Sequence, residues 1–192
     1  MSFRTFKNLI YSLVAKSDFR RWSDIGNHDE AWSGRTLAMS KYVAPGESVF
    51  EFGAGRCHLR EMLPEGCSYT PSDIVERDPG TYVCDLNHQP LPVFPRHDVA
   101  VCSGVLEYVH DLDPVAAALA KSFDRLIVSY ADIDRNPKKS KRIRNGWFNH
   151  LTRRKFLGKF EAAGYRLDQE SLWERHGIYV FKLRDKGTAH NA

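Results

Sequence analysis

The sequence lacks the cysteine spacing of a disulfide framework or of a structural zinc site. Its four cysteines form no CxxC pair and lie mostly among apolar neighbours; they are Cys57, Cys67, Cys84 and Cys102. Cysteines of this kind are typical of reduced core residues in a cytosolic protein. We therefore predict a cytoplasmic protein that holds no metal.

Long hydrophobic runs are also missing. No uninterrupted apolar stretch is long enough to cross a bilayer, and the first residues show no signal-peptide pattern with a cleavage site. A chain of 192 residues that is 42% hydrophobic has the size and the core of one soluble domain. The net charge of +4 permits an acidic partner without requiring one.

What the sequence does contain is a glycine turn between a predicted strand and a predicted helix. Residues 48–52 alternate and end in apolar, β-favouring side chains, which indicates a short buried strand. Gly53 and Gly55 follow at once, and a helical pattern begins near Arg56. Strand, glycine turn and helix together open a nucleotide-binding α/β unit.

The turn departs from the dinucleotide fingerprint, because His58 stands where the third glycine is needed. Glu51 also lies two residues before Gly53, and a phosphate would not favour a carboxylate there. A carboxylate suits a positively charged ligand such as S-adenosylmethionine (SAM), which carries an ammonium, a sulfonium and no phosphate. The alternative is a turn that merely joins a strand to a helix.

An acidic residue ends the next predicted strand, residues 68–74. Asp73 lies about twenty residues beyond the glycine turn, where nucleoside-binding units place the acid that binds the ribose hydroxyls. A carboxylate offers two oxygens to two vicinal hydroxyls. The alternative is a helix N-cap.

Further strands are predicted over residues 81–87, 98–104 and 125–130. The second of these is almost continuously apolar, as a central parallel strand must be. Its last residues, Ser103 and Gly104, are expected to face the ligand, since open α/β sheets bind ligands at the carboxyl ends of their strands.

Four segments in order resemble the motifs of class I SAM-dependent methyltransferases: residues 51–55 (Glu-Phe-Gly-Ala-Gly), 72–74 (Ser-Asp-Ile), 84–86 (Cys-Asp-Leu) and 98–108. The resemblance covers about residues 45–185. It implies a three-layer α/β/α sandwich, with a mostly parallel seven-stranded sheet and one antiparallel strand near the C-terminus. It also implies SAM as the cofactor.

The resemblance assigns roles residue by residue. In the family the acid at Asp85 accepts a hydrogen bond from the adenine amino group, and Leu86 packs on the ring. Family members often have histidine directly after Glu107, whereas this sequence has Tyr108; both residues are expected to line the methyl-transfer pocket. The expected cofactor-binding residues are Glu51, Gly53, Ala54, Gly55, Asp73, Ile74, Asp85, Leu86, Ser103 and Gly104.

Residues 1–44 are predicted to form an N-terminal helical extension. Residues 3–16 have the pattern of a basic amphipathic helix, which either packs over the cofactor cleft or touches a membrane surface or a partner. A loop is predicted over 17–31 and a helix over 32–43. Related methyltransferases close such segments over SAM, so Trp22, Trp32 and Arg35 are candidate contacts, with a core or surface role as the alternative.

A basic run occupies residues 135–144 and contains six lysines or arginines: Arg135, Lys138, Lys139, Lys141, Arg142 and Arg144. One interpretation is recognition of an anionic acceptor that carries phosphate, carboxylate or a charged glycan. A second is nucleic-acid binding. The third is a flexible run of solvated charges.

The C-terminal part is predicted to hold a helix and a hairpin. Thr152 is the expected N-cap of a helix that ends at Gly164, and strands are expected over 165–172 and 177–183. His150 is a candidate general base for an acceptor hydroxyl, since a histidine pKa near 6.5 allows proton uptake at neutral pH; a structural role in the loop is the alternative. Residues 186–192 are predicted to be a disordered tail.

Methyl transfer from a sulfonium is a direct displacement that needs alignment and exclusion of water rather than a metal or a covalent residue. No Asn-Pro-Pro-Tyr-type motif follows the fourth strand, and residues 103–107 resemble enzymes that act on small molecules, lipids or sugars. The sequence thus predicts O-methylation of a small-molecule or glycan hydroxyl. The alternatives are an RNA methyltransferase that uses residues 135–144, and a SAM-binding partner subunit or sensor without catalysis.

Overall fold

The computed structural model describes residues 16–184. The helix predicted over 3–16, apart from Lys16, and the predicted tail from 186 lie outside the described residues. Among those described, no helix has the length and apolar character needed to cross a membrane. No cluster of histidine, cysteine, aspartate or glutamate in the same residues could hold a metal ion.

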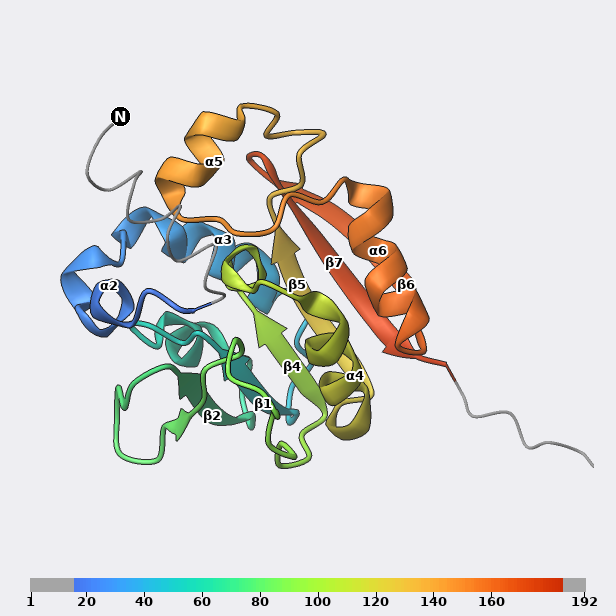
Figure 1. Cartoon of the computed structure of the whole chain (residues 1–192). Coiled ribbons are helices and arrows are strands. Elements are labelled where there is room, and N and C mark those ends of the chain that lie inside the picture. Colours follow the sequence, from blue (N-terminus) through green and yellow to red (C-terminus); the bar gives the residue numbers. More distant parts are fainter. Residues whose placement is uncertain (1–15, 185–192) are drawn as a thin grey trace, which may run out of the picture.

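Seven strands form one mixed sheet (Figure 1). They are β1 (Ser48–Phe52), β2 (Ser68–Asp73), β3 (Tyr82–Val83), β4 (Val99–Cys102), β5 (Arg125–Tyr130), β6 (Tyr165–Trp173) and β7 (His176–Leu183). The order across the sheet is β3-β2-β1-β4-β5-β7-β6, and β7 runs antiparallel to both of its neighbours while the other pairings are parallel. The predicted sheet with one antiparallel strand is confirmed.

The third strand is shorter than the predicted residues 81–87. After Val83 the backbone leaves the sheet because the Asp85 carboxylate accepts the N–H of Asn87 at 2.9 Å and closes a turn. A short strand followed by a tight turn brings Asp85 back toward the end of β2.

The predicted loop over residues 17–31 is wrong. Three short helices occupy it: α2 (Phe19–Ser23), η1 (Ile25–Asn27) and η2 (Glu30–Trp32). Each begins after an aspartate, namely Asp18, Asp24 and Asp29, whose side chain accepts a backbone N–H of the first turn. Aspartates spaced at intervals of five or six residues therefore act as N-caps here rather than as loop residues.

The remaining helices are α3 (Ser33–Ser40), η3 (His58–Met62), η4 (Leu106–Tyr108), α4 (Leu112–Ser122), α5 (Lys139–Asn145) and α6 (Arg153–Ala162). The helix expected after the glycine turn is only the 3-10 helix η3, because Cys57 has a left-handed backbone (φ +56°) that interrupts an α-helix. Thr152 caps α6 as predicted and accepts the N–H of Lys155 at 3.2 Å.

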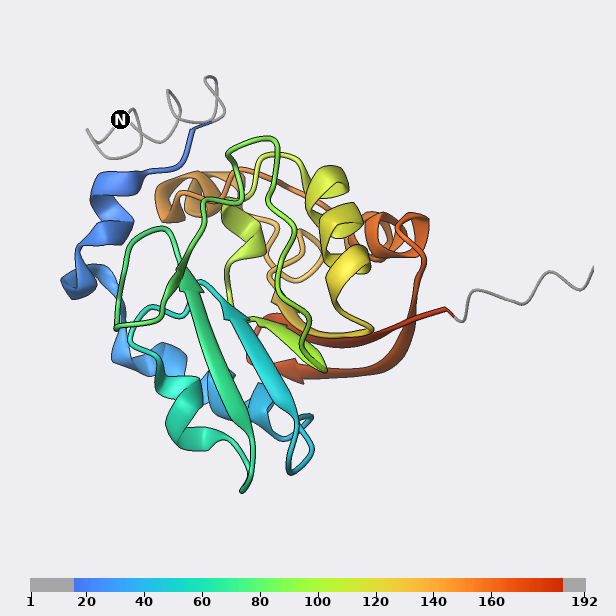
Figure 2. The ribbon, with the colours of Figure 1, turned by 90° about the horizontal axis from the view of Figure 1, so that it is seen from below.

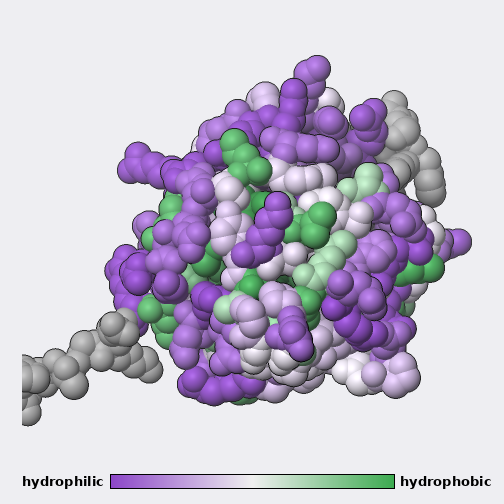
Figure 3. Space-filling view, turned by 180° about the vertical axis from the view of Figure 1, so that it is seen from behind, coloured by the Kyte–Doolittle hydropathy of each residue, from purple (hydrophilic) through white to green (hydrophobic). Residues whose placement is uncertain are grey.

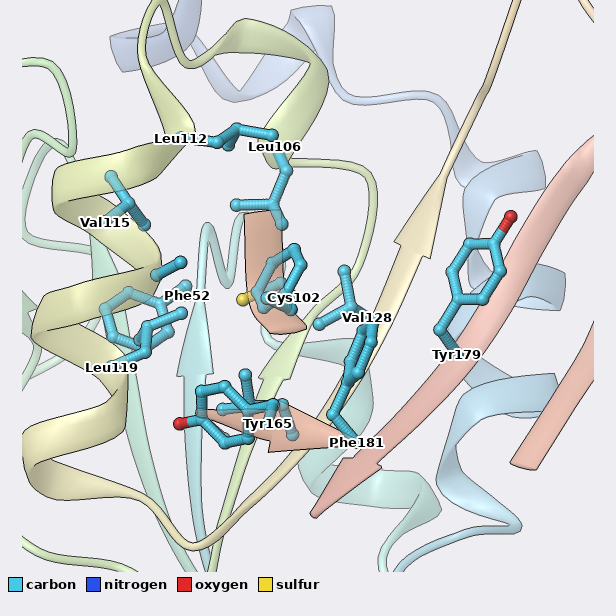
Figure 4. Packing of buried hydrophobic residues seen from close by; sticks show 14 of the residues in the cluster. Phe52, Cys102, Leu106, Leu112, Val115, Leu119, Val128, Tyr165, Tyr179 and Phe181 are labelled. Atoms are coloured by element: carbon cyan, nitrogen blue, oxygen red, sulfur yellow. The ribbon is translucent and has the colours of Figure 1, made fainter. Parts of the chain in front are cut away.

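Helices cover both faces of the sheet, which completes the three layers (Figures 1 and 2). On one face α4 and α6 bury a large apolar cluster that includes Phe52, Leu119 and Phe181 (Figure 4). On the other, α3 and η3 pack over a smaller cluster that includes Val49 and Ile127. The surface opposite the view of Figure 1 is mostly hydrophilic, with hydrophobic residues exposed in small groups (Figure 3).

Glu51 lies on β1 two residues after Val49, so it points to the smaller apolar layer. The side chain is 3% exposed and accepts a hydrogen bond from the Tyr69 hydroxyl. Burial raises the pKa of Glu51 to about 8. Glu51 is therefore mostly protonated at neutral pH, which differs from the charged carboxylate expected at this position.

Replacing Glu51 with glutamine tests whether the folded protein keeps this side chain protonated. Between pH 4.5 and about 8 the unfolded chain loses the Glu51 proton while the folded chain keeps it, so the free energy of unfolding falls as the pH rises. Glu51→Gln should remove this fall, and its stability relative to the wild type should increase by roughly 2–4 kcal/mol over that range. Urea unfolding across the range measures it, with the exposed Glu65→Gln as control. Parallel profiles for wild type and Glu51→Gln would contradict the prediction.

Candidate active site

Two adjoining cavities open at the carboxyl ends of β1, β2 and β4. The first has a volume of about 130 Å³ and the second about 240 Å³. They share four lining residues: Trp32, Arg35, Gly104 and Tyr108. The two cavities are therefore neighbours, and these four residues lie between them.

Two glycines line the first cavity because no side chain fits there. A Cβ on Gly53 would lie 2.3 Å from Val105 Cγ2, and one on Gly104 would lie 2.3 Å from Arg35 Nη2. Both residues also have positive φ, +66° and +67°. The backbone is thus exposed to the cavity at the ends of β1 and β4, as a closely held ligand requires.

Asp73 is the most tightly held carboxylate of the first cavity. Its Oδ2 accepts the N–H of Gly55 at 2.8 Å, and its Oδ1 accepts the N–H of Ile74 at 2.7 Å. Arg77 Nη2 lies 3.3 Å from the same Oδ1 and also donates to the carbonyl of Trp22. The carboxylate therefore joins the glycine turn, the end of β2 and the N-terminal segment.

Asp85 is fixed in a similar way on the opposite side. Ser17 Oγ donates to Asp85 Oδ1 at 2.6 Å, and the amide of Asn87 donates to Ser17 Oγ at 2.8 Å. Leu86, which is buried, and Ile74 line the same cavity. One carboxylate beside apolar side chains suits a purine with its amino group, and the other suits a ribose.

Seven of the ten predicted cofactor-binding residues line the first cavity: Gly53, Asp73, Ile74, Asp85, Leu86, Ser103 and Gly104. Glu51, Ala54 and Gly55 do not line either cavity. Ala54 is buried, and Gly55 contributes through its N–H to Asp73. The cofactor roles of these residues stay predictions.

The candidate contacts from the N-terminal extension are also present. Trp22, Trp32 and Arg35 all line the first cavity. Arg35 is 6% exposed, and its Nε and Nη2 donate to Ser103 Oγ and Ser103 O at 3.1 and 3.2 Å. The extension therefore forms one wall of the cavity and holds a guanidinium over the end of β4.

Glu107 lines the second cavity and is 1% exposed. Its Oε1 accepts the N–H of Ala131 at 2.8 Å, whereas Oε2 has no hydrogen-bond partner among the described residues. Burial raises the pKa of Glu107, and the Arg35 charge counteracts part of this rise. Glu107 is thus a buried acid in the cavity wall, and one of its carboxylate oxygens has no partner among the described residues.

Tyr108 lines both cavities and separates them. The indole N–H of Trp147 donates to its hydroxyl at 3.3 Å, and the Trp22 ring meets its ring edge-on with centroids 4.6 Å apart. Tyr108 thus links the N-terminal extension to the segment after α5.

His150 lies outside both linings. Its Nδ1 accepts a hydrogen bond from Arg142 Nε at 3.0 Å. Burial and the charge of Arg142 lower its pKa. This geometry favours the structural alternative, and the role of His150 as a base stays a prediction without support from its position.

Several residues of the second cavity were not predicted from the sequence, among them Trp147, Trp173 and His176. All four tryptophans of the chain line one cavity or both, a convergence that their sequence positions do not indicate. The buried Nδ1 of His176 has no partner among the described residues. Burial and the charge of Arg35 lower the His176 pKa to about 4, so its imidazole is neutral at neutral pH.

Comparison with known proteins agrees with this geometry. A family model described as a methyltransferase domain matches residues 25–170. A search of curated proteins finds no match.

Solved structures show the same fold at low sequence identity. One is a chain from the complex between the Haloferax volcanii Trm112 methyltransferase activator and a putative methyltransferase (11% identity, TM-score 0.70, 88% of this chain and 98% of that one). Another is the Burkholderia thailandensis 1,6-didemethyltoxoflavin-N1-methyltransferase with bound S-adenosylhomocysteine (16% identity, TM-score 0.65, 93% of this chain and 88% of that one). A third is the mitomycin 7-O-methyltransferase MmcR (16% identity, TM-score 0.65, 95% of this chain and 68% of that one).

The first cavity fits SAM, because its two carboxylates, apolar lining and exposed glycine backbone match the adenine, ribose and cationic parts of that molecule. The family model covers most of the chain, and solved methyltransferase structures share its fold. The chain therefore belongs to the methyltransferase-domain family, and it is a class I SAM-dependent methyltransferase.

Proposed function

We propose that the protein methylates a hydroxyl group of a small molecule bound in the second cavity. The observation that carries this proposal is Glu107, which lines a cavity that shares a wall with the cofactor cavity and whose Oε2 has no hydrogen-bond partner among the described residues. Bound SAM would supply the methyl group. The protein has to hold the acceptor oxygen toward the shared wall and remove its proton.

Glu107 is the group proposed to take up that proton. A hydroxyl oxygen that gains a methyl group must lose its hydrogen, and a carboxylate within hydrogen-bond reach can accept it. The N–H of Ala131 holds Oε1, whereas Oε2 has no partner among the described residues and is the oxygen proposed to take the proton. The raised pKa makes the carboxylate a stronger base than an exposed one.

The contacts that residues of the basic run make within the protein favour a small-molecule acceptor over RNA. Arg142 is 1% exposed and donates to the carbonyls of Ala131 and Asn149. Arg135 pairs with Asp132 and Glu170. Two of the six basic residues therefore hold the structure together rather than face solvent. Two of the solved structures with this fold are named as small-molecule methyltransferases, one acting at nitrogen and one at oxygen.

Cofactor binding can be tested by neutralising Asp73. Asp73→Asn should weaken the binding of S-adenosylhomocysteine by about tenfold or more, because hydrogen bonds to a charged acceptor contribute ~1.5–3 kcal/mol. Isothermal titration calorimetry measures the affinity. The control Asp78→Asn removes a carboxylate that pairs with Arg60 outside both cavities. Equal affinity of folded Asp73→Asn and wild type would refute the assignment.

Catalysis can be separated from binding at Glu107. Glu107→Gln should lower kcat by ~10²-fold or more, as expected for loss of a general base, with little effect on S-adenosylhomocysteine affinity. The wild-type rate should rise with pH through a range above that of an ordinary carboxylate, since the pKa of Glu107 is raised. A variant that retains full kcat would exclude Glu107 as the base. Cofactor binding without turnover in the wild type would favour the non-catalytic subunit.

The RNA alternative can be tested at the exposed lysines of the basic run. Reversing Lys138, Lys139 and Lys141, all of which are exposed, should leave methylation of a small acceptor unchanged within about twofold, because none of them lines a cavity. Filter binding to a structured RNA at several salt concentrations supplies the opposing measurement. Salt-dependent RNA binding that the reversal abolishes would favour the RNA methyltransferase.

A further inference from the structure

The formal charges around the second cavity do not suit an anionic acceptor. Three acidic residues line it, Asp29, Glu107 and Glu174, against the single guanidinium of Arg35. His176 adds no charge because its pKa is lowered to about 4. Arg35 is moreover held by Ser103, so part of its donor capacity is already used. The basic run does not contribute to the lining, so nothing in the cavity offers an excess of positive charge.

A cationic acceptor is disfavoured for a different reason. Each of the three tryptophans of this cavity already lies near a guanidinium: Arg35 Cζ is 6.0 Å from the Trp32 ring centroid and 5.9 Å from that of Trp173, and Arg142 Cζ is 4.9 Å from that of Trp147. A second cation would be attracted by the same rings and by the three carboxylates, but it would compete with Arg35 for both and be repelled by that buried guanidinium. A neutral molecule avoids both costs.

The inner wall of the second cavity is aromatic, and few of its buried polar atoms lack a hydrogen-bond partner among the described residues. Trp32, Trp147 and Trp173 come from three distant segments, and Tyr108 adds a fourth ring. His176 lies near two of the indoles, 6.2 Å from Trp147 and 5.7 Å from Trp173 between ring centroids. Of the residues that line this cavity, Glu107 and His176 each have a buried polar atom, Oε2 and Nδ1, with no partner in the part of the chain that the structure describes. Two such atoms match one or two polar groups on a ligand rather than the several hydroxyls of a sugar.

From these observations we propose that the acceptor is a neutral, flat aromatic molecule that carries a hydroxyl group. Its ring packs among Trp32, Trp147 and Trp173, where aromatic contacts add to the burial of apolar area. Its hydroxyl donates to Glu107 Oε2, and His176 Nδ1 binds a second polar group. The inference rests on the proposed function, and it replaces the anionic acceptor that the basic run suggested with an uncharged phenol-like class.

The test compares ligands of similar shape and different charge. The full-length protein is saturated with S-adenosylhomocysteine and titrated by calorimetry with neutral 2-naphthol, anionic 2-naphthoate, cationic 2-naphthylmethylammonium and methyl α-glucoside. We expect saturable binding of 2-naphthol that is at least about tenfold tighter than that of the other three. Equal or tighter binding of a charged analogue or of the glucoside, or no saturable binding of 2-naphthol, would overturn the inference.

Variants locate the binding site. Trp173→Leu and, independently, Trp147→Leu should weaken 2-naphthol by about tenfold and leave S-adenosylhomocysteine affinity unchanged, since neither tryptophan lines the first cavity. Leu172→Ala is the matched control, because Leu172 precedes Trp173 on β6 and is 58% exposed. Retained 2-naphthol affinity in both folded tryptophan variants would contradict the proposed site.

Activity distinguishes this inference from the proposed function on which it rests. Methylation of the glucoside but not of 2-naphthol would overturn the aromatic acceptor and keep the hydroxyl methyltransferase. Binding of 2-naphthol with no methylation of any hydroxyl in the panel would keep the aromatic binding site and overturn the hydroxyl methyltransferase.

Discussion

The Asp73 carboxylate is the contact on which the cofactor end of this molecule depends. It accepts the N–H of Gly55 from the glycine turn and the N–H of Ile74 from its own strand end. It also pairs with Arg77, whose guanidinium donates to backbone carbonyls of Trp22 and Ser23. Three segments far apart in sequence therefore meet at one buried charge. A buried charge needs such partners, and these partners place the N-terminal extension over the first cavity.

The elements that could be predicted from the sequence are those whose local pattern agrees with the fold. Strand β5 was predicted at its observed bounds, and β1 likewise, because each is a short apolar run beside a turn signal. The segment from 17 to 31 was misjudged because its residues are polar, yet aspartates that follow one another at short intervals cap successive turns. A left-handed Cys57 is not visible in sequence, so the shortening of the helix after it could not be foreseen.

The candidate site likewise has one part that could be predicted from the sequence and one part that could not. The predicted cofactor-binding residues follow strand ends in order, so spacing together with the family resemblance predicted that Asp73, Asp85 and Gly104 share a site, and all three line the first cavity. The second cavity instead combines the extension, the segment after α5 and the β6–β7 turn, which only the strand order β5-β7-β6 makes neighbours. No spacing rule predicts that Trp147 and His176 share a wall. Recognition of an anion, nucleic-acid binding and solvated charges were the three interpretations of the basic run, and none of them foresaw that Arg142 is buried against two carbonyls. Composition alone does not show which charged side chains face inward.

Two buried glutamates show how the surroundings of an acid distinguish a structural role from a proposed catalytic one. Glu51 and Glu107 are both almost fully buried, and burial raises the pKa of each. Glu51 lies in an apolar layer where the Tyr69 hydroxyl is its hydrogen-bond partner. Glu107 instead lies near the charges of Arg35 and Arg142, which stabilise its ionised form, and it lines the second cavity. Because Arg35 compensates that charge from the shared wall, a neutral acceptor can give its proton to Glu107 without bringing a second charge into the site.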